Sequence, residues 1–255
     1  MHTNIECKQC HKQFVKAVNF CGFCGASIQS TKVEKRNIAL NLVIVFFITF
    51  LLFALAVYLI NERLESSLVK ELVIELAFAS LVIGFSLFDW KAILKTYKVP
   101  KLSGNIWAWT FIIPILSSIV VYYFVNAMNT ILFGDSDYSY FESYLYLDNP
   151  LPWAIFFVAI LPPIFEELAF RGFLFNQLQK IVSERMTIVG TAFLFALVHF
   201  SLISFLWIFP FGLLLGYLRS KYKTLWLGII IHFIHNLIII LWDYYDYQNL
   251  IHFLE

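Results

Sequence analysis

The fold class is decided by residues 38–60, IALNLVIVFFITFLLFALAVYLI, a run that contains no charged side chain. A helix needs about 20 apolar residues to cross the hydrocarbon core of a bilayer. The run follows a polar head that carries cysteines, whereas a signal peptide has its apolar stretch close to the N-terminus. We therefore interpret residues 38–60 as a retained transmembrane span.

The composition of the whole chain supports the same class. The chain is 60% hydrophobic and 14% charged, whereas about a quarter of the residues of a soluble domain are charged. A soluble core is diluted by the polar surface that covers it, so this apolar excess indicates a lipid bilayer as the surroundings. The net charge of +1 provides no large basic field, which argues against a nucleic-acid partner.

Six further apolar stretches are candidates for spans. We predict an all-α, polytopic transmembrane helix bundle of about seven spans, with a small N-terminal zinc-ribbon head. The seven candidate spans are Ile38–Ile60, Val69–Phe88, Ile106–Met128, Leu151–Leu178, Met186–Phe200, Leu202–Leu218 and Leu225–Leu241.

The charges in the connecting segments alternate along the chain. Lys and Arg are frequent before residue 38 and in residues 91–101, 180–185 and 219–223, and they are absent from residues 134–150 and from the tail. Because Lys and Arg collect on the cytoplasmic side, we expect a multi-pass protein of the cell membrane with a cytoplasmic N-terminus and the C-terminus outside. The expected domains are a ribbon (1–30), a linker (31–37), a transmembrane helical domain (38–242) and a tail (243–255).

The head contains all four cysteines of the chain, Cys7, Cys10, Cys21 and Cys24. They form two C-x-x-C pairs, and each pair can point two thiolates at one tetrahedral centre. Two disulfides or a redox pair are the alternatives, but disulfides need an oxidising compartment. We expect structural zinc, because four thiolates leave no open position for catalysis and metal binding supplies the folding energy of so small a segment.

Two adjacent carboxylates, Glu166 and Glu167, follow Pro162-Pro163 in an otherwise apolar stretch. Charged side chains inside a span are costly and are functional by default. Glu167 and Arg171 are four residues apart, a spacing that favours a helical ion pair. Glu166 points about 100° away from Glu167 and is left unpaired by that arrangement. The proline pair breaks or starts a helix, which would place both carboxylates in its first turn.

Three imidazoles and an amide also stand out in the later apolar stretches. His199 ends the fifth candidate span, where a lone histidine is more often a packing residue than a ligand or base. His232 and Asn236 are four residues apart in the last span and share a helix face, with His235 beside them. Polar contacts between helices are the alternative explanation for this pair.

These three polar groupings occur in a recognisable order. The patterns Glu166-Glu167-x-x-x-Arg171, Phe195-x-x-x-His199 and His232-x-x-x-Asn236 resemble the three motifs of the CPBP family. That family comprises CAAX prenyl endopeptidases of the second type and bacteriocin-processing, abortive-infection-like membrane proteins. The resemblance covers roughly residues 150–240.

The resemblance implies a role for each matching residue. Glu166 would activate water with the help of His199, His232 and Asn236 would stabilise the oxyanion, and Glu167 with Arg171 would form a structural pair. Family members are often called metalloproteases, with Glu166, His199 and His232 as candidate metal ligands. A metal site and a metal-free mechanism both stay open, and we favour the metal-free form.

We therefore expect an intramembrane endopeptidase, a CAAX-type peptidase that cuts membrane-associated peptides or proteins with water activated by glutamate and histidine. Whether the substrate is prenylated is left open, and the ribbon is a candidate for binding a protein partner. The alternative is a non-catalytic membrane protein, a transporter or an immunity scaffold, because buried Glu and His also build proton relays.

Overall fold

The computed structural model describes residues 5–7, 9–14, 20–26, 30–134 and 139–254. The head contains a small antiparallel ribbon of β1 (Ile5–Glu6) and β2 (Gln13–Phe14), in which Ile5 pairs with Phe14. Residues 1–4, 15–19 and 27–29 of the predicted zinc ribbon lie outside the described part of the chain. The rest is helical, so the predicted all-α bundle with a small head is confirmed.

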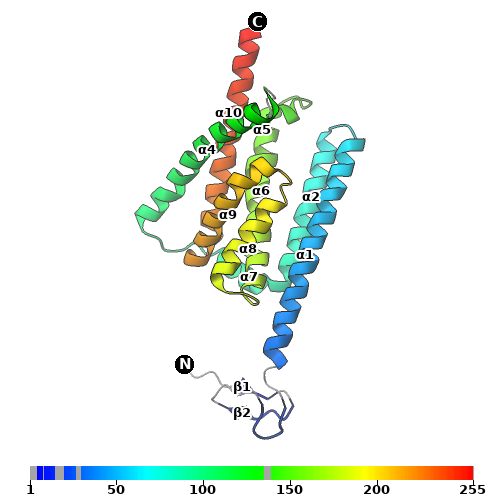
Figure 1. The fold of residues 1–255 in the computed structure, drawn as a ribbon, viewed down its shortest axis with the longest axis vertical. Helices are drawn as coiled ribbons and strands as arrows, with labels where there is room; N and C mark the ends of the chain where they lie inside the picture. The colour runs from blue at the N-terminus through cyan, green and yellow to red at the C-terminus, as the bar shows by residue number, and fades with distance from the viewer. Residues whose placement is uncertain (1–4, 8, 15–19, 27–29, 135–138, 255) are drawn as a thin grey trace.

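The helices form one elongated bundle, with the head at one end and the C-terminal end of α10 at the other (Figure 1). Within the described residues, six helices are long and apolar enough to cross a membrane, and the protein is an integral, multi-pass membrane protein. The elements outside the fourth span are α1 (Ser30–Arg63), α2 (Leu68–Ser86), η1 (Leu87–Asp89), α3 (Trp90–Thr96), α4 (Gly104–Phe133), η2 (Glu142–Tyr144), α8 (Glu184–Leu197), α9 (Leu202–Tyr222) and α10 (Trp226–Leu254).

The fifth predicted span, Met186–Phe200, is shorter than the six long helices. It corresponds to α8, which has 14 residues and therefore rises about 21 Å, less than the roughly 30 Å of a hydrocarbon core. The helix ends because Phe200 takes a positive φ of 49° and the side chain of Ser201 caps the start of α9. α8 packs along α9 as the short arm of a helical hairpin (Figure 1).

Two segments that were expected to lie outside the bundle are helical. Residues 31–37, the expected linker, belong to α1, and residues 243–254 of the expected tail continue α10. The sequence has no Gly or Pro between residues 30 and 63 or after Gly228, so nothing in the backbone stops either helix. The apolar runs identify the parts of these helices that can cross the hydrocarbon core, and the helices extend beyond those parts.

The fourth span is one continuous helix of 29 residues, Pro150–Leu178. It contains two π-helical segments, in which backbone hydrogen bonds join residues five apart. Its parts are α5 (Pro150–Ala154), η3 (Ile155–Ile160, π), α6 (Leu161–Glu166), η4 (Glu167–Leu174, π) and α7 (Phe175–Leu178). A helix does not start at Pro162-Pro163 as expected, because the wider register of η3 removes the clash that a proline makes in an α-helix. Glu166 and Glu167 therefore lie near the middle of the span.

Aromatic rings join the first spans to this helix. The ring of Phe46 in α1 lies 5.2 Å from that of Phe173 and 6.1 Å from that of Phe170, both in η4. The ring of Phe170 in turn lies 5.2 Å from that of Phe195 in α8. All four side chains are at most 1% exposed, so η4 forms the centre of the core.

Gly212 of α9 lies at a close approach of α9 to α8. A Cβ atom at this position would lie 3.1 Å from the Cα of Ala192 and 3.2 Å from Nη2 of Arg171. A Cβ at Gly84 of α2 would have no atom within 4 Å. We predict that Gly212→Ala lowers the free energy of unfolding by about 1–3 kcal/mol through overpacking. Thermal unfolding of purified protein measures this, and Gly84→Ala is the matched control.

The control should leave stability unchanged or raise it slightly, since replacing a helical Gly by Ala in open space removes backbone entropy from the unfolded chain. An equal loss of stability in the two variants would contradict the close packing of α8 on α9.

Candidate active site and metal centre

A buried ion pair lies in η4. Oε1 of Glu167 lies 2.9 Å from Nη1 of Arg171, and both residues are 0% exposed. An unpaired charge in this position would be strongly destabilising, and pairing reduces the cost of burying either charge. The four-residue spacing on the sequence thus corresponds to a contact in the structure.

Arg171 is held by two other elements of the bundle, α8 and α9. Its Nη2 donates to the carbonyl of Gly212 at 3.2 Å, and its guanidinium lies 4.2 Å from the ring centroid of Phe195. The Nε of Arg219 donates to the backbone carbonyl of Arg171 at 2.9 Å. The guanidinium of Arg171 is therefore bound by contacts from α8 and α9 as well as by Glu167.

Gly228 of α10 leaves space for the carboxylate of Glu167. A Cβ atom at Gly228 would lie 2.6 Å from Oε2 of Glu167 and 3.2 Å from its carboxyl carbon. Real Cβ atoms do not approach a neighbour at 2.6 Å, so a larger residue here would displace the carboxylate. The absence of a side chain at Gly228 brings α10 against the carboxylate of η4.

His232, one turn further along α10, faces both carboxylates. Its Nδ1 lies 3.5 Å from Oε1 of Glu167, and its Nε2 lies 3.8 Å from Oε2 of Glu166. The side chain of His232 is 6% exposed and that of Glu166 is 21% exposed. Glu166, which the helical spacing left unpaired, thus lies against His232 and keeps an open side.

His199 is exposed just beyond the end of α8. Its Nδ1 lies 2.8 Å from the carbonyl of Phe195, and a carbonyl can only accept, so Nδ1 carries the proton. In the neutral ring Nε2 is then left as an acceptor. The ring of Phe195 lies 5.1 Å from that of His199 and 6.0 Å from that of His232, so both imidazoles contact the same aromatic side chain.

Asn236 is also held on α10. Its Nδ2 donates to the backbone carbonyl of Val158 at 2.9 Å, which joins α10 to η3. His235 lies on another face, where its Nδ1 is 2.9 Å from the hydroxyl of Ser117 in α4. The structure therefore brings Glu166, Glu167, Arg171 and His232 together, while Asn236 contacts the turn that precedes them and His235 contacts α4.

Glu75 of α2 is a residue that our reading of the sequence missed. It is an ionisable residue in an apolar span, and α2 packs against α6 and η4. These two segments carry Glu166 and Glu167. The signal is present in the sequence, since a carboxylate between Val69 and Phe88 is costly and suggests a function.

An apolar groove runs between α4 and α9. Its volume is about 530 Å³. Its wall includes Ser117, Trp207 and Phe211. The ring of Phe211 lies 5.6 Å from that of His232, so the groove reaches the residues around the two carboxylates.

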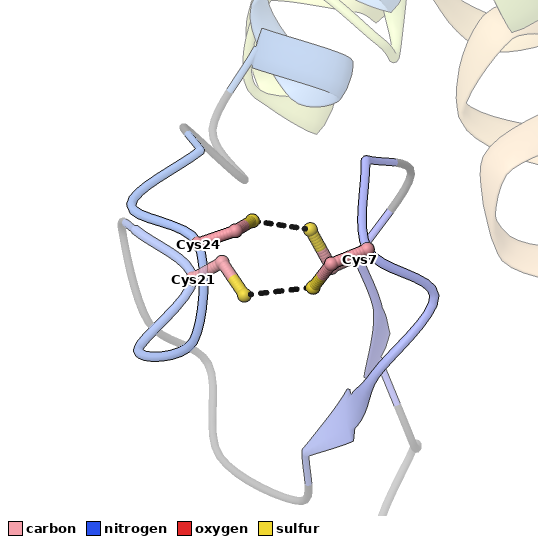
Figure 2. Close-up of side chains that lie close together, drawn as sticks. Cys7, Cys21 and Cys24 are labelled. Carbon is pink, nitrogen blue, oxygen red and sulfur yellow. Dashed lines mark hydrogen bonds between the residues drawn. The ribbon is translucent and has the colours of Figure 1, made fainter.

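The cysteine head is a second candidate site. The sulfur atoms of Cys7 and Cys24 lie 3.5 Å apart, as do those of Cys10 and Cys21 (Figure 2). All four ligand atoms lie within 4.8 Å of one another. Zinc–sulfur bonds of 2.3 Å in a tetrahedron separate the sulfurs by about 3.8 Å, so this donor set fits a tetrathiolate metal.

Backbone groups of the two C-x-x-C turns favour thiolates. The backbone N–H of Cys10 lowers the pKa of Cys7. Burial raises the pKa of Cys21, but the backbone N–H groups of Phe23 and Cys24, together with the thiols of Cys10 and Cys24, outweigh it and lower the pKa of Cys21 to about 6. The N–H groups of Lys12 and Ala26 act in the same sense on Cys10 and Cys24, but burial and the neighbouring thiols outweigh them and raise the pKa of both. Metals bind the deprotonated sulfur, so these N–H groups prepare the ligands.

The comparisons with known proteins agree with the resemblance drawn from the motifs. Residues 148–238 match the family model described as Rce1-like, type II CAAX prenyl endopeptidase. The match contains Glu166, Glu167, Arg171, His199 and the two α10 residues His232 and Asn236. It leaves the head and α1–α4 outside. No curated protein and no solved structure matches the chain significantly.

The ion pair of Glu167 and Arg171 can be tested by double substitution. We predict that Glu167→Gln lowers the free energy of unfolding by about 3–5 kcal/mol, because it leaves the guanidinium of Arg171 buried without its counter-charge. Adding Arg171→Met should restore part of that loss, because no unpaired charge remains. Chemical denaturation of the two single variants and the double variant measures the coupling. A double variant that loses the sum of the two single losses would show that the pair does not act as a unit.

Proposed function

We propose that this protein is an intramembrane endopeptidase in which Glu166 activates a water molecule. The proposal is carried by the position of Glu166, a partly exposed carboxylate near the middle of a span, 3.8 Å from Nε2 of His232. A positioned carboxylate can accept a proton from water during attack on a carbonyl. The match of residues 148–238 to endopeptidases supports hydrolysis as the reaction.

In the proposed reaction, Glu166 takes a proton from water as the oxygen attacks the scissile carbonyl carbon. The tetrahedral intermediate then collapses, the C–N bond breaks, and Glu166 returns the proton to the leaving amine. A protonated His232 can donate from both nitrogens, from Nδ1 towards Glu167 and from Nε2 towards the oxyanion. Hydrogen bonds aimed at a developing oxyanion are a large term in such catalysis.

His199 and Asn236 complete the proposed set. With its Nδ1 proton bound to Phe195, a neutral His199 offers Nε2 as an acceptor for a water proton. The amide of Asn236 has one N–H beyond the one bound to Val158, and the resemblance assigns it to the oxyanion. Glu167 and Arg171 are proposed to hold η4 and His232 in place without touching substrate.

The donor geometry favours the metal-free form of this mechanism. Among the described residues, the four cysteines form the group whose ligand atoms converge within 4.8 Å, and Glu166, His199 and His232 do not form such a group. The three residues could hold a catalytic metal only if their ligand atoms converged further. The proposal therefore uses Glu166 as the base.

We propose a membrane-associated peptide or protein tail as the substrate. The groove between α4 and α9 supports this class, because it is apolar and its wall residue Phe211 contacts His232. An apolar group of the substrate in the groove, a prenyl chain among others, would bring the adjoining peptide bond near Glu166. The loop charges support a cytoplasmic head and an external C-terminus.

Glu166→Gln tests the proposed base. We predict that hydrolysis of a membrane-associated peptide by the purified protein falls by about 100- to 10,000-fold, the usual contribution of a general base. The thermal unfolding curve should keep its shape. Glu65→Gln, in the exposed segment between α1 and α2, is the matched control and should leave the rate unchanged. Full activity of the Glu166→Gln protein would exclude this mechanism.

The cysteine head is proposed to bind one structural zinc ion and to offer a surface to a protein partner. We predict one zinc per chain by elemental analysis of purified protein, and none after Cys10→Ser with Cys21→Ser. His11→Ala is the control, since His11 contacts Glu6 and is not part of the cysteine cluster. Stoichiometric zinc in a protein that lacks all four cysteines would place a metal elsewhere and contradict the metal-free form.

A further inference from the structure

The carbonyl of Val158 has lost its usual partners within the helix. In an α-helix it would accept from the N–H of residue 162, and in a π-helix from that of residue 163. Both residues are prolines, and proline has no backbone N–H. The N–H of Leu161 is already used, because it donates to the carbonyl of Phe156.

A carbonyl inside a membrane needs a donor from the protein. No water is available in the hydrocarbon core, and an unsatisfied backbone group there is costly. Side chains of neighbouring helices can supply the missing bond where a proline interrupts a span. Nδ2 of Asn236 in α10 supplies it here, at 2.9 Å from the oxygen of Val158.

The bond lies between two parts of the candidate active site. Asn236 is one turn after His232, which faces Glu166. Val158 is in η3, which leads through α6 into Glu166. The bond between Asn236 and Val158 therefore joins α10 to η3. These are the helix that carries His232 and the segment that leads to Glu166.

We propose that Asn236 is a positioning residue whose amide replaces the backbone N–H that Pro162 and Pro163 lack and thereby sets Glu166 against His232. Its effect on stability is independent of the proposed function, whereas its effect on hydrolysis rests on that function. The proposal explains the need for an amide: a carboxylate of the same shape has no N–H to donate to a carbonyl.

A stability cycle tests the bond. Thermal unfolding is measured for the full chain, for Asn236→Ala, for Pro163→Ala and for the double variant. Asn236→Ala should lower the Tm by about 2–4 °C, the shift expected when one buried hydrogen bond is lost. The shift should be at most half as large in the Pro163→Ala background, where residue 163 has an N–H for Val158. Pro162→Ala provides the same test if Pro163→Ala does not fold.

Pro210→Ala is the matched control, because Pro210 lies in α9 and removes no donor from Val158. The effect of Asn236→Ala should be unchanged in that background. An equal Tm shift in all backgrounds, or no shift in the wild type, would overturn the proposal.

Hydrolysis by the same proteins tests positioning. Asn236→Ala should lower kcat by about 10- to 100-fold, as expected for a small misplacement of reacting groups, and the loss should be smaller in the Pro163→Ala background. A loss of equal size in both backgrounds would overturn the positioning role and leave Asn236 with the proposed oxyanion contact alone. Absence of hydrolysis by the wild type would contradict the proposed function, while the Tm cycle would still decide the hydrogen bond.

Discussion

The buried ion pair between Glu167 and Arg171 is the interaction on which the centre of the bundle depends. Two charges at 0% exposure persist only if every neighbouring element supplies what they need. α9 provides the carbonyl of Gly212, α8 the ring of Phe195, and α10 the space at Gly228. The requirement to satisfy this pair thus brings four segments of the chain into contact at one point.

The proposed catalytic residues take their places from that arrangement. His232 lies one turn beyond Gly228, so the contact of α10 with Glu167 also directs the imidazole to Glu166. Glu166 lies at the end of α6, between two π-helical segments. Wide turns of this kind are frequent at functional sites.

The sequence predicted the features that depend on composition and spacing. The apolar runs placed the long spans, and the Glu167–Arg171 spacing indicated a contact that is present. The end of α8 was missed because it depends on the positive φ of Phe200 and on Ser201, whose side chain caps the start of α9. The π-helical turns could not be predicted. The α and π registers differ only in whether each N–H donates to the carbonyl four or five residues before it, and the same apolar sequence fits both.

Candidate site residues were predictable to the extent that they are ionisable. Glu166, His199 and His232 are conspicuous in apolar runs, and Glu75 would have been found by the same criterion. Val158 could not be found from its side chain, because the group that contacts Asn236 is its backbone carbonyl. Its importance follows from two prolines further along the helix and from an amide on α10, which only the folded chain brings together.

The central claim is that Glu166 and His232 form one reaction centre. It is tested most directly by the rate of peptide hydrolysis for Glu166→Gln, His232→Gln and the double variant. Residues that act as a unit show strongly non-additive losses, so the double variant should be no slower than the worse single variant. Losses that multiply in the double variant would contradict a single centre.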